Sequence, residues 1–357
     1  MRPRLVHAHR LERWIGAECV EAMSRSMVGM RHPVPVGNIP GRVWCYDGEF
    51  YGKLVGGQAA GFADYLWDYI ALLKNQRGGF TSLSDLINEV TVNAKKQAGF
   101  HFVKTGVAAP AIGASQTLWR LAQWPLAGAN AAAAPGGTIP TNASTGSFLQ
   151  KDAAGGDTLH LLNMFVSNST TQSTVLMLYD YLFGVNINHA TSSNSVTGVP
   201  TRYQTAAFAP GNFLSGNVTT ALNATAHNIT VTYVDQDGNT AEAGSAQAIR
   251  VSSAVDTTPF TQPKWMYLLN AADSGLRNVT NISFSAAPTG NVDWYIGHPL
   301  MLAPCPAIAF QGVYIDGLNQ TFSLERIYDG ACLALAELYK SATAAANLVG
   351  YVQMASG

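Results

Sequence analysis

The sequence is poor in charge. Charged residues fill 12% of its 357 positions, about half the share in an average soluble protein. Its 21 basic and 22 acidic residues leave a formal net charge of -1, so no basic field is available to hold nucleic acid through its phosphates. We therefore expect no direct, sequence-specific nucleic-acid partner. Apolar residues make up 47%, which excludes a chain kept unfolded by charge.

Long apolar runs without helix breakers are also missing. The two longest uncharged tracts, 121–150 and 203–234, are interrupted by prolines, glycines and many polar residues. Neither tract could satisfy its backbone in lipid as one helix, so we expect no membrane insertion. Residues 1–30 begin with arginines, but no apolar region follows and glutamates interrupt the segment. This pattern predicts neither a secretory signal nor a mitochondrial presequence.

Cysteine is scarce and widely spaced. Cys19, Cys45, Cys305 and Cys332 form no C-x-x-C pair, and both zinc fingers and disulfide frameworks need closer spacing. We expect four free thiols and synthesis in a reducing cytoplasm. Without a signal peptide, the Asn-x-Ser/Thr sequons are explained by an Asn- and Thr-rich composition.

The N-terminal segment, residues 1–77, carries helical and hairpin patterns. Apolar residues recur at helical spacing over 10–27 and again over 62–73. Between them, 43–46 and 49–51 flank an Asp-Gly pair, which is typical of a β-hairpin. These elements are too few to enclose a large core. The segment is either a small α+β subdomain packed on the rest of the chain or an arm that docks on another subunit.

A capped helix and a long irregular stretch follow. Within 78–104, Ser82 with Asp85 three residues later is a helix start signal, and Gly99 is a stop signal. Residues 105–157 are rich in Ala, Gly, Pro and Thr, with one strand-like run at 117–124. This stretch is too long for a loop inside a compact domain and too apolar for a solvated linker. We therefore predict an extended arm that lies across other protein surface.

Residues 158–357 predict a β domain. Ile229, Val231 and Tyr233 alternate with threonines, the period-2 pattern of a half-buried strand. Further runs of this kind are separated by Gly, Pro and Asn turns; the candidate strands are 159–166, 175–183, 228–234, 248–252, 265–269, 279–284, 292–301 and 310–315. Such spacing indicates a sandwich, a jelly roll or a barrel. Residues 332–345 fit either a helix or strands, and we favour closing strands at 332–339 and 348–354. The fold class is therefore mainly β, with a C-terminal β-sandwich or jelly-roll-like domain, an N-terminal α-helical and hairpin segment and an extended arm.

No residue pattern predicts a catalytic, cofactor-binding or metal site. His7 and His9 could join Cys19, His32 and Cys45 around zinc. However, alternating histidines share a side only in a strand, and this stretch adjoins a predicted helix. The other histidines are scattered singly. We therefore assign no zinc site.

Two groups of acidic residues likewise predict no metal or catalytic site. The run 235–239 begins like a calcium loop, but Thr240 replaces the needed Gly and Ala246 replaces the bidentate Glu. A hairpin turn explains the same residues. Asp64 and Asp68 share a helix face, where a solvated side of the helix is the simpler interpretation. No Walker loop, HExxH or G-x-S-x-G motif occurs.

Aromatic residues offer one binding hypothesis. A sugar-binding surface could be lined by Trp119, Trp124, Trp265, Trp294, Tyr179, Tyr181 and Tyr295. Aromatic residues also fill sheet cores, which is the more common role. Both interpretations remain open from the sequence.

The order and composition of these segments resemble those of a known class of protein. The capped stretch Gly79–Glu89, the Ala/Gly/Pro arm and a Thr/Asn-rich β domain with a turn at 233–238 are similar to structural proteins of tailed-bacteriophage particles. Those are chiefly capsid decoration or cement proteins and minor capsid proteins. The resemblance covers residues 78–357 and implies no cofactor and no catalytic residues. It also implies a virion location after synthesis in the bacterial host cytoplasm. The implied partners are copies of the chain itself, as a homo-oligomer, and the major capsid protein or tail subunits.

Three functions follow as hypotheses. The first is a non-enzymatic virion subunit that contacts its neighbours through 105–157 and 10–27. The alternative is a receptor- or glycan-binding module on a phage tail or fibre. The third is a hydrolase with an unrecognised site, which requires converging carboxylates or a His–carboxylate pair in a pocket.

Overall fold

The structure is a computed structural model that divides the chain into two compact units, Met1–Val92 and Asn93–Gly357. The residues that it describes are 42–46, 49–53, 59–61, 100–106, 115–148, 150, 152, 157–171, 173–261, 264–317, 324–339 and 347–356. The helices predicted from the sequence at 10–27, 62–73 and within 78–99 lie outside these residues. In the described part no helix is long and apolar enough to cross a membrane.

The first unit contains the predicted hairpin. Strand β1 (Arg42–Tyr46) pairs antiparallel with β2 (Glu49–Lys53), and β2 pairs with β3 (Ala59–Gly61). Trp44 lies opposite Tyr51 in the first pair. The hairpin prediction is therefore confirmed, with a third strand that the sequence analysis did not identify.

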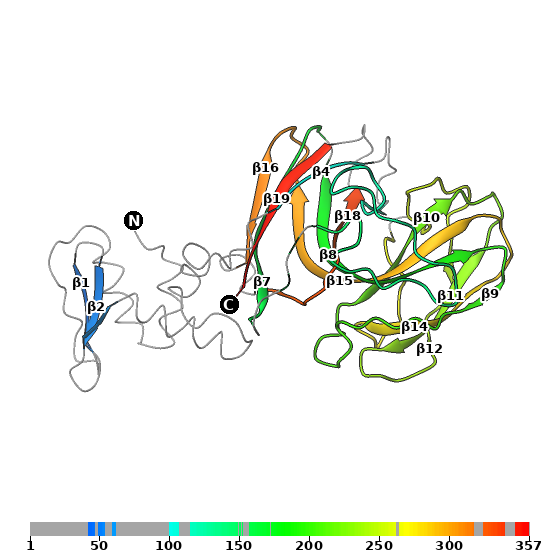
Figure 1. The fold of residues 1–357 in the computed structure, drawn as a ribbon, viewed down its shortest axis with the longest axis horizontal. Helices are drawn as coiled ribbons and strands as arrows, with labels where there is room; N and C mark the ends of the chain where they lie inside the picture. Colours follow the sequence, from blue (N-terminus) through cyan, green and yellow to red (C-terminus); the bar gives the residue numbers. More distant parts are fainter. Residues whose placement is uncertain are drawn as a thin grey trace. The chain divides into compact units, whose positions relative to one another are not determined.

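The second unit consists of three antiparallel sheets (Figure 1). The central sheet has the order β10 (Phe213–Thr220), β15 (Asn291–Cys305), β8 (Thr174–Asn188), β18 (Leu333–Tyr339) and β5 (Ser115–Thr117). The β11 sheet has the order β12 (Glu242–Ala243), β11 (Asn228–Asp235), β14 (Leu276–Phe284) and β9 (Ser193–Ser195), with β13 (Gln247–Ala248) also on β11. The β7 sheet has the order β16 (Gly312–Asp316), β7 (Leu159–Asn168), β19 (Asn347–Ser356), β4 (Phe100–Thr105) and β6 (Gln123–Trp124), with β17 (Arg326–Ile327) beside β7. The mainly β prediction is confirmed.

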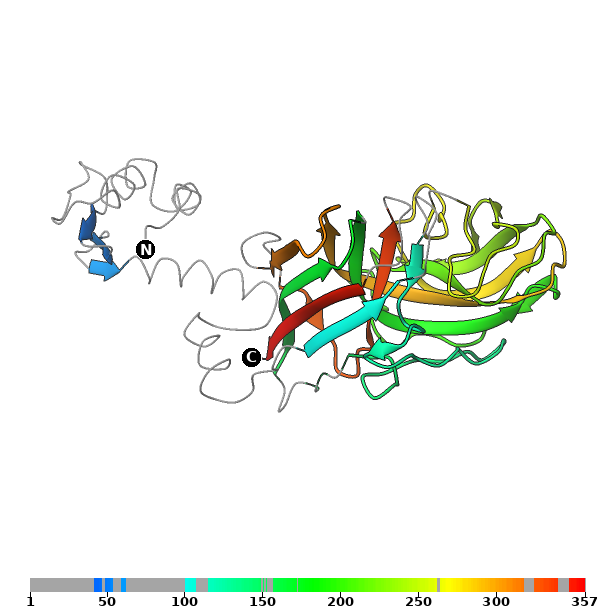
Figure 2. The ribbon, with the colours of Figure 1, turned by 90° about the horizontal axis from the view of Figure 1, so that it is seen from above.

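The two long strands β8 and β15 run side by side through this unit and serve two apolar cores (Figure 2). One core lies between the central sheet and the β11 sheet, and the other between the central sheet and the β7 sheet. Each long strand has one extra residue in its register, Leu182 in β8 and Leu300 in β15. An extra residue reverses the alternation of side chains. As a result, the even-numbered residues that precede Leu182 in β8 face the core under the β7 sheet. The odd-numbered residues that follow Leu182 face the core under the β11 sheet.

The other face of the central sheet is covered by its own chain. Tyr179, Tyr181 and Tyr295 project from this face and are buried under Trp119 and Trp265. The Trp119 ring meets Tyr181 edge-on at 5.2 Å. The central sheet is therefore buried on both faces over this region, which explains why β8 reads as a nearly continuous apolar run.

Most of the predicted strands are present. The runs predicted at 159–166, 175–183, 228–234, 279–284, 292–301 and 310–315 correspond to β7, β8, β11, β14, β15 and β16. The two closing strands also form, as β18 and β19, so strands rather than a helix occupy 333–339.

Three strand predictions are wrong. In the run at 248–252 only Ala248 belongs to a strand, β13, while Ile249 forms an isolated bridge with Phe260, and 265–269 contains no strand. The run at 265–269 instead lies over the central sheet, where the ring centroids of Trp265 and Phe213 are 5.2 Å apart. The run at 117–124 splits, because β5 joins the central sheet and β6 joins the β7 sheet. The segment between them crosses from one sheet to the other.

The region predicted as a capped helix ends in a strand. Residues 100–104 belong to β4, whose burial alternates with period 2. The helix itself, predicted to stop at Gly99, lies outside the described residues and stays a prediction. Gly99, read as a helix stop, immediately precedes the strand.

The predicted arm lies on its own domain over residues 131–138. There the chain fills the edge of β8 that β18 leaves open: Thr138 and Gly184 exchange both backbone hydrogen bonds, and Asn186 does the same with Ala132 and Ala134. Gly137 has φ +71°, and a Cβ there would stand 2.4 Å from the Phe183 ring. The small residues of this segment thus have an intramolecular cause, because a bulkier chain could not lie so close.

Candidate functional site

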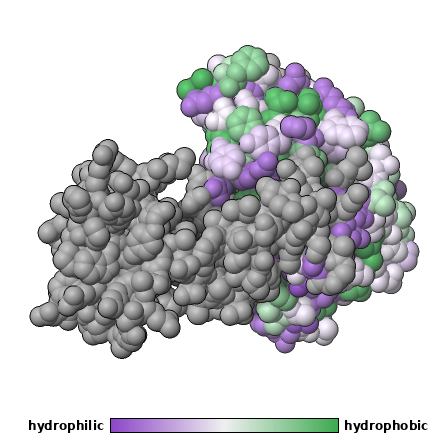
Figure 3. Space-filling view, turned by 60° about the vertical axis from the view of Figure 1, so that its left-hand side comes forward, coloured by the Kyte–Doolittle hydropathy of each residue, from purple (hydrophilic) through white to green (hydrophobic). Residues whose placement is uncertain are grey.

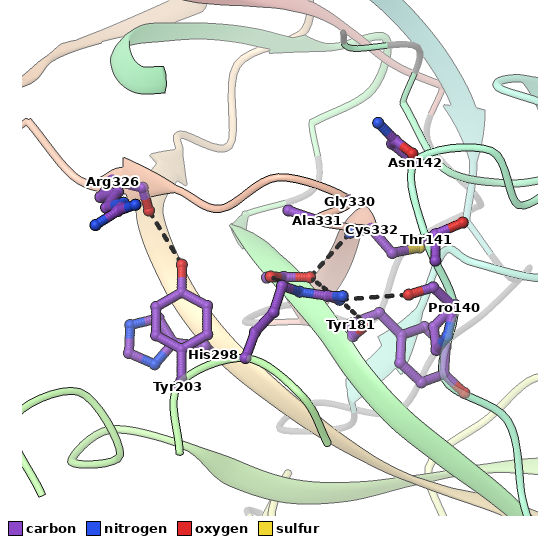
Figure 4. A network of polar contacts seen from close by, with 12 residues as sticks. Pro140, Thr141, Asn142, Tyr181, Tyr203, His298, Arg326, Gly330, Ala331 and Cys332 are labelled. Atoms are coloured by element: carbon purple, nitrogen blue, oxygen red, sulfur yellow. Dashed lines mark hydrogen bonds and ion pairs between the residues drawn. The ribbon is translucent and has the colours of Figure 1, made fainter. Parts of the chain in front are cut away.

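The most highly connected polar group in the described residues is a buried ion pair between the two apolar cores (Figure 4). Asp180 on β8 is fully buried. Both of its oxygens accept hydrogen bonds from Arg202, from Nε and Nη2, each at 2.8 Å. Asp180 Oδ1 also accepts the backbone N–H of Cys332 at 2.9 Å. This is the fork geometry in which arginine binds a carboxylate most strongly.

The position of the pair follows from strand register. Asp180 lies opposite His298 of β15 and opposite Leu333 of β18. On the same face of the central sheet, Leu178 belongs to the core under the β7 sheet and Ile296 to the core under the β11 sheet. The ion pair therefore occupies the seam between the cores.

Arg202 links the pair to the surrounding loops. Its Nη2 also donates to the carbonyl oxygens of Pro140 at 3.3 Å and Tyr181 at 3.1 Å. The next residue, Tyr203, stacks on the His298 imidazole with centroids 3.8 Å apart. Tyr203 Oη donates to the carbonyl of Arg326 at 3.0 Å. The Arg202 side chain thus connects the 131–140 segment, β8 and the loop before β10.

His298 is held in one tautomer. Asn212 Nδ2 donates to the carbonyl oxygens of Tyr203 and Leu276, so Asn212 Oδ1 is left as an acceptor. His298 Nδ1 lies 2.8 Å from that oxygen and must therefore carry the proton. Burial lowers the pKa of His298 to about 4.

These groups are arranged for structure rather than for reaction. Burial raises the pKa of the Asp180 carboxyl, while the hydrogen bonds and charge of Arg202 oppose that rise. The carboxylate has no exposed surface through which a substrate could reach it. A His–carboxylate pair of the kind that the hydrolase hypothesis requires is not formed here, because Asp180 is bound by Arg202 and His298 by Asn212.

A second buried polar group anchors the 131–138 segment. Asp293 on β15 accepts Asn186 Nδ2 at 2.6 Å and the backbone N–H of Ala131 at 3.2 Å. Asn186 Oδ1 accepts from Asn291 Nδ2 at 2.8 Å. Burial raises the pKa of Asp293, whereas the bond from Asn186 lowers it. This network fastens the predicted arm to the sheet edge.

A third polar group is a pair of buried histidines. His189 Nδ1 lies 3.0 Å from His227 Nε2, and His227 Nδ1 lies 3.0 Å from the Thr225 carbonyl. The carbonyl requires a proton on His227 Nδ1, so His189 Nδ1 donates to His227 Nε2. Phe284 stacks on His189 at 4.0 Å, and the remaining His189 nitrogen, Nε2, has no hydrogen-bond partner in the described part of the chain. Burial, followed by the neighbouring His227, lowers the pKa of His189 to about 3.

Lys104 on β4 is the fourth such group. Its ammonium donates to the carbonyl oxygens of Leu121 at 2.8 Å and Pro125 at 2.6 Å. Burial lowers its pKa to about 8. The side chain ties β4 to the crossing segment between β5 and β6, so its role is again to join two parts of the fold.

The predicted turn at 235–239 has the geometry of a turn and not of a calcium site. Asp235 Oδ1 accepts the backbone N–H groups of Asp237, Gly238 and Asn239 at 2.9, 2.7 and 2.8 Å. Asp235 Oδ2 accepts Asn239 Nδ2 at 2.7 Å. Gly238 has φ +97°, which favours glycine. Both carboxylate oxygens are already bound within the turn.

The other metal candidates lie outside what the structure describes. His7, His9, Cys19 and His32 are not among the described residues, nor are Asp64 and Asp68; for Cys45 only the backbone is described. Among the described residues, no three His, Cys, Asp or Glu side chains are grouped to hold a metal ion.

The aromatic residues considered for sugar binding do not form one surface. Five of the seven are buried, namely Trp119, Trp294, Tyr179, Tyr181 and Tyr295. Trp265 is partly buried, and Trp124 is 48% exposed. The interpretation of these residues as core is confirmed for the five buried ones.

Sequence reasoning missed the ion pair, the His298–Asn212 contact and the His189–His227 pair. Asp180 sits within the apolar run 175–185, and a charged residue inside a buried strand requires a partner. That rule signals that Asp180 is paired. It does not name Arg202, whose position depends on the loop before β10.

Comparison with known proteins identifies no family. No family model matches the chain, and no curated protein matches it. Among solved structures, VP2 of infectious bursal disease virus in a subviral particle is similar at 11% identity, over 76% of this chain and 85% of that one, with a TM-score of 0.15. The T13 particle of the same virus gives 10% identity over 80% and 82% with a TM-score of 0.16. The T=1 particles give 9% identity over 76% and 82% with a TM-score of 0.15. The similar structures are thus viral-particle proteins, but at these TM-scores the likeness carries no argument about function.

Proposed function

We propose that the chain is a non-enzymatic structural protein of a virus particle. The observation that carries this proposal is where the polar and apolar groups lie. The buried charged and imidazole groups are engaged in holding strands, loops and cores together. Large apolar side chains, in contrast, remain at the surface of the described part, where a neighbouring molecule would cover them.

The inward placement of polar groups supports a non-enzymatic role. Catalysis needs ionisable side chains that converge on a space a substrate can enter. Asp180, Arg202 and His189 are instead buried, and their partners are other parts of the same unit. Their common effect is to fix the geometry of a rigid building block.

The outward placement of apolar groups supports assembly with neighbours. Phe310 is 76% exposed and Leu126 is 60% exposed, and Leu302 and Ile308 are also exposed. Figure 3 shows apolar side chains reaching the surface of the described part in this view. Covering a side chain of this size contributes about 1.5–3 kcal/mol. Several such contacts would hold a subunit in a shell whose geometry repeats.

Within this class we assign the chain to the decoration or cement proteins, or to the minor capsid proteins, of tailed bacteriophages. The finer assignment rests on the sequence resemblance over 78–357. The exposed side chains of 126–139 are the contacts that we propose for the predicted arm, since its backbone is already bonded to β8. Its partners would be the major capsid protein and copies of the chain.

Mass spectrometry of purified particles tests the proposal. Nuclease-treated particles from a culture whose viral genome encodes the chain should contain it at a fixed ratio to the main shell protein, through repeated density-gradient steps. A chain found only in the cleared lysate, and absent from intact particles, would show that it is not a virion component. Empty and full heads, analysed separately, would distinguish a shell protein from a tail protein.

A further inference from the structure

The outer face of the β7 sheet carries a flat apolar surface. In β4 the buried and exposed residues alternate, and His101, Val103 and Thr105 point away from the core. Register places Val103 beside Trp124 on one side and Val349 on the other. The neighbouring row continues across four strands; its members are Tyr314, Phe165, Tyr351 and His101. We call these two rows, with the polar residues around them, the outer face.

The aromatic rings of the outer face pack against one another. Phe165 and Tyr351 stack with centroids 5.4 Å apart and planes 18° apart. His101 meets Tyr351 edge-on at 6.1 Å. Because Phe165 and Tyr351 stack on each other, one face of each ring is already covered and is closed to a sugar ring. The outer face is therefore suited to contact with another protein surface rather than to stacking with a carbohydrate.

Charge on the outer face favours a second copy as the occupant. In β16, β7, β19, β4 and β6 the paired outward positions include no lysine, arginine or glutamate, and the exposed Arg326 of β17 lies opposite His160, toward one end of β7. Over these five strands two copies therefore meet without like-charge repulsion. The carboxylate of this face, Asp316, lies at the β16 edge, and its imidazole, His101, lies beyond the centre on β4. Strand β19 is central in the order β16-β7-β19-β4-β6. A two-fold axis along β19 would bring the Asp316 edge of each copy toward the His101 side of the other.

The area of the outer face fits a weak contact between copies. Each outward position covers about 4.8 by 6.7 Å, so the fourteen paired outward positions of the five strands give about 450 Å² per copy. Two copies would bury about 900 Å², just under the ~1,000 Å² of a specific interface. One such contact would be weak in solution, but many of them act together in a closed shell.

We propose that the outer face is a self-association surface at which a second copy of the chain docks about a two-fold axis. This inference rests on the proposed function, which requires contacts between copies. It adds which face makes them. It also implies that association in solution depends on Val349, which lies on the central strand.

Sedimentation velocity over a range of concentrations tests the inference on the full chain. Val349→Lys places a charge at the centre of the face and should weaken self-association by about tenfold or more. Val251→Lys is the matched control, because Val251 is 41% exposed and Val349 is 38% exposed, and it should leave association unchanged. Circular dichroism and the midpoint of thermal unfolding confirm that both variants fold.

A cross-linking experiment gives a second, independent measurement. Val349→Cys should be joined between copies by a short bis-maleimide above the level of the unsubstituted chain, and Val251→Cys should not. A chain that stays monomeric, or equal effects of the two lysine variants, would overturn the inference. So would a Val349→Lys variant that loses stability as a monomer, because the face would then be covered within one chain. If particles contain the chain while these variants behave alike, the proposed function stands and this surface assignment fails.

Discussion

Breaking the Asp180–Arg202 pair should be among the most destabilising single changes in this fold. Asp180→Asn keeps an acceptor for the Cys332 amide but leaves the Arg202 guanidinium without a counter-charge. Removing one partner of a buried ion pair typically costs about 3–5 kcal/mol. Arg202→Met should cost a similar amount at neutral pH, since it leaves a buried carboxylate without a counter-charge and removes the Arg202 donor from the carbonyls of Pro140 and Tyr181.

The double variant separates the pair from its surroundings. Asp180→Leu with Arg202→Met removes both charges, so only the Cys332 amide and the two carbonyls lose their side-chain partners. Their combined cost is about 3–9 kcal/mol, at about 1–3 kcal/mol for each of the three groups. Additive single effects would instead give about 6–10 kcal/mol. We therefore expect a coupling energy of about 1–3 kcal/mol.

The free energy of unfolding of the Arg202→Met variant should depend on pH. In Arg202→Met the carboxyl of Asp180 lacks its cation, so its folded pKa lies above the unfolded value. The folded state of the variant then binds more protons, and the variant regains stability as the pH falls. The difference in unfolding free energy from the unsubstituted chain should narrow between pH 7 and pH 5.

Urea unfolding followed by tryptophan fluorescence measures these changes. The control is Asp256→Asn, which removes a more exposed ion pair with Arg120 at 3.3 Å and should cost at most about 1 kcal/mol. If Asp180→Asn costs no more than this control, the seam is not a buried, water-free environment. Additive effects in the double variant would equally contradict a pair that acts as one unit.

Three further predictions follow from the other polar groups. The folded pKa of His189, about 3, lies below the unfolded value of about 6.5. The free energy of unfolding should therefore fall as the pH drops from about 6.5 toward 3, by up to about 5 kcal/mol. Urea unfolding of His189→Gln should show a flatter dependence on pH, while the exposed control His101→Gln keeps the original slope. Asp235→Ala removes the acceptor of three backbone amides and should cost about 2 kcal/mol, and calcium should not shift the thermal midpoint of the unsubstituted chain; a rise on adding calcium would disprove the turn interpretation. Burial raises the pKa of the Cys305 thiol to about 12 and also raises that of Cys332, so peptide mapping should find both unlabelled by iodoacetamide in the native chain and labelled in urea.

Strand positions were predictable where side chains alternate or where an apolar run is long. Ile229, Val231 and Tyr233 are buried, as their spacing indicates. Strand β10 was missed, since after its first two residues Phe213–Thr220 reads as Ser, Gly, Asn and Thr with a single apolar residue, Val218. Its polar residues are buried because their side chains bond to neighbouring segments; Ser215, for example, donates to the Trp265 carbonyl. Such bonds depend on tertiary contacts that the local sequence does not contain.

The sites were less predictable than the strands, for a physical reason. The switch of each long strand from one core to the other depends on a single extra residue, Leu182 or Leu300. Neither residue differs in type from its neighbours, so the sequence shows an apolar run and no change of face. The seam that these bulges create is what requires a buried acid at Asp180. Predicting the ion pair would have required predicting the register first.

The small residues of 131–138 show that composition alone does not identify a partner. An Ala/Gly/Pro segment was expected to need a neighbouring subunit, because its apolar side chains are poorly solvated. Here the backbone is bonded to β8 while Leu126 and Ile139, on either side, remain exposed. Small residues let the chain lie close to the sheet, and the larger ones are left facing outward. If the chain assembles as we propose, its contacts are therefore to be sought on outward side chains, on this segment and on the outer face of the β7 sheet, rather than on an arm that must first detach.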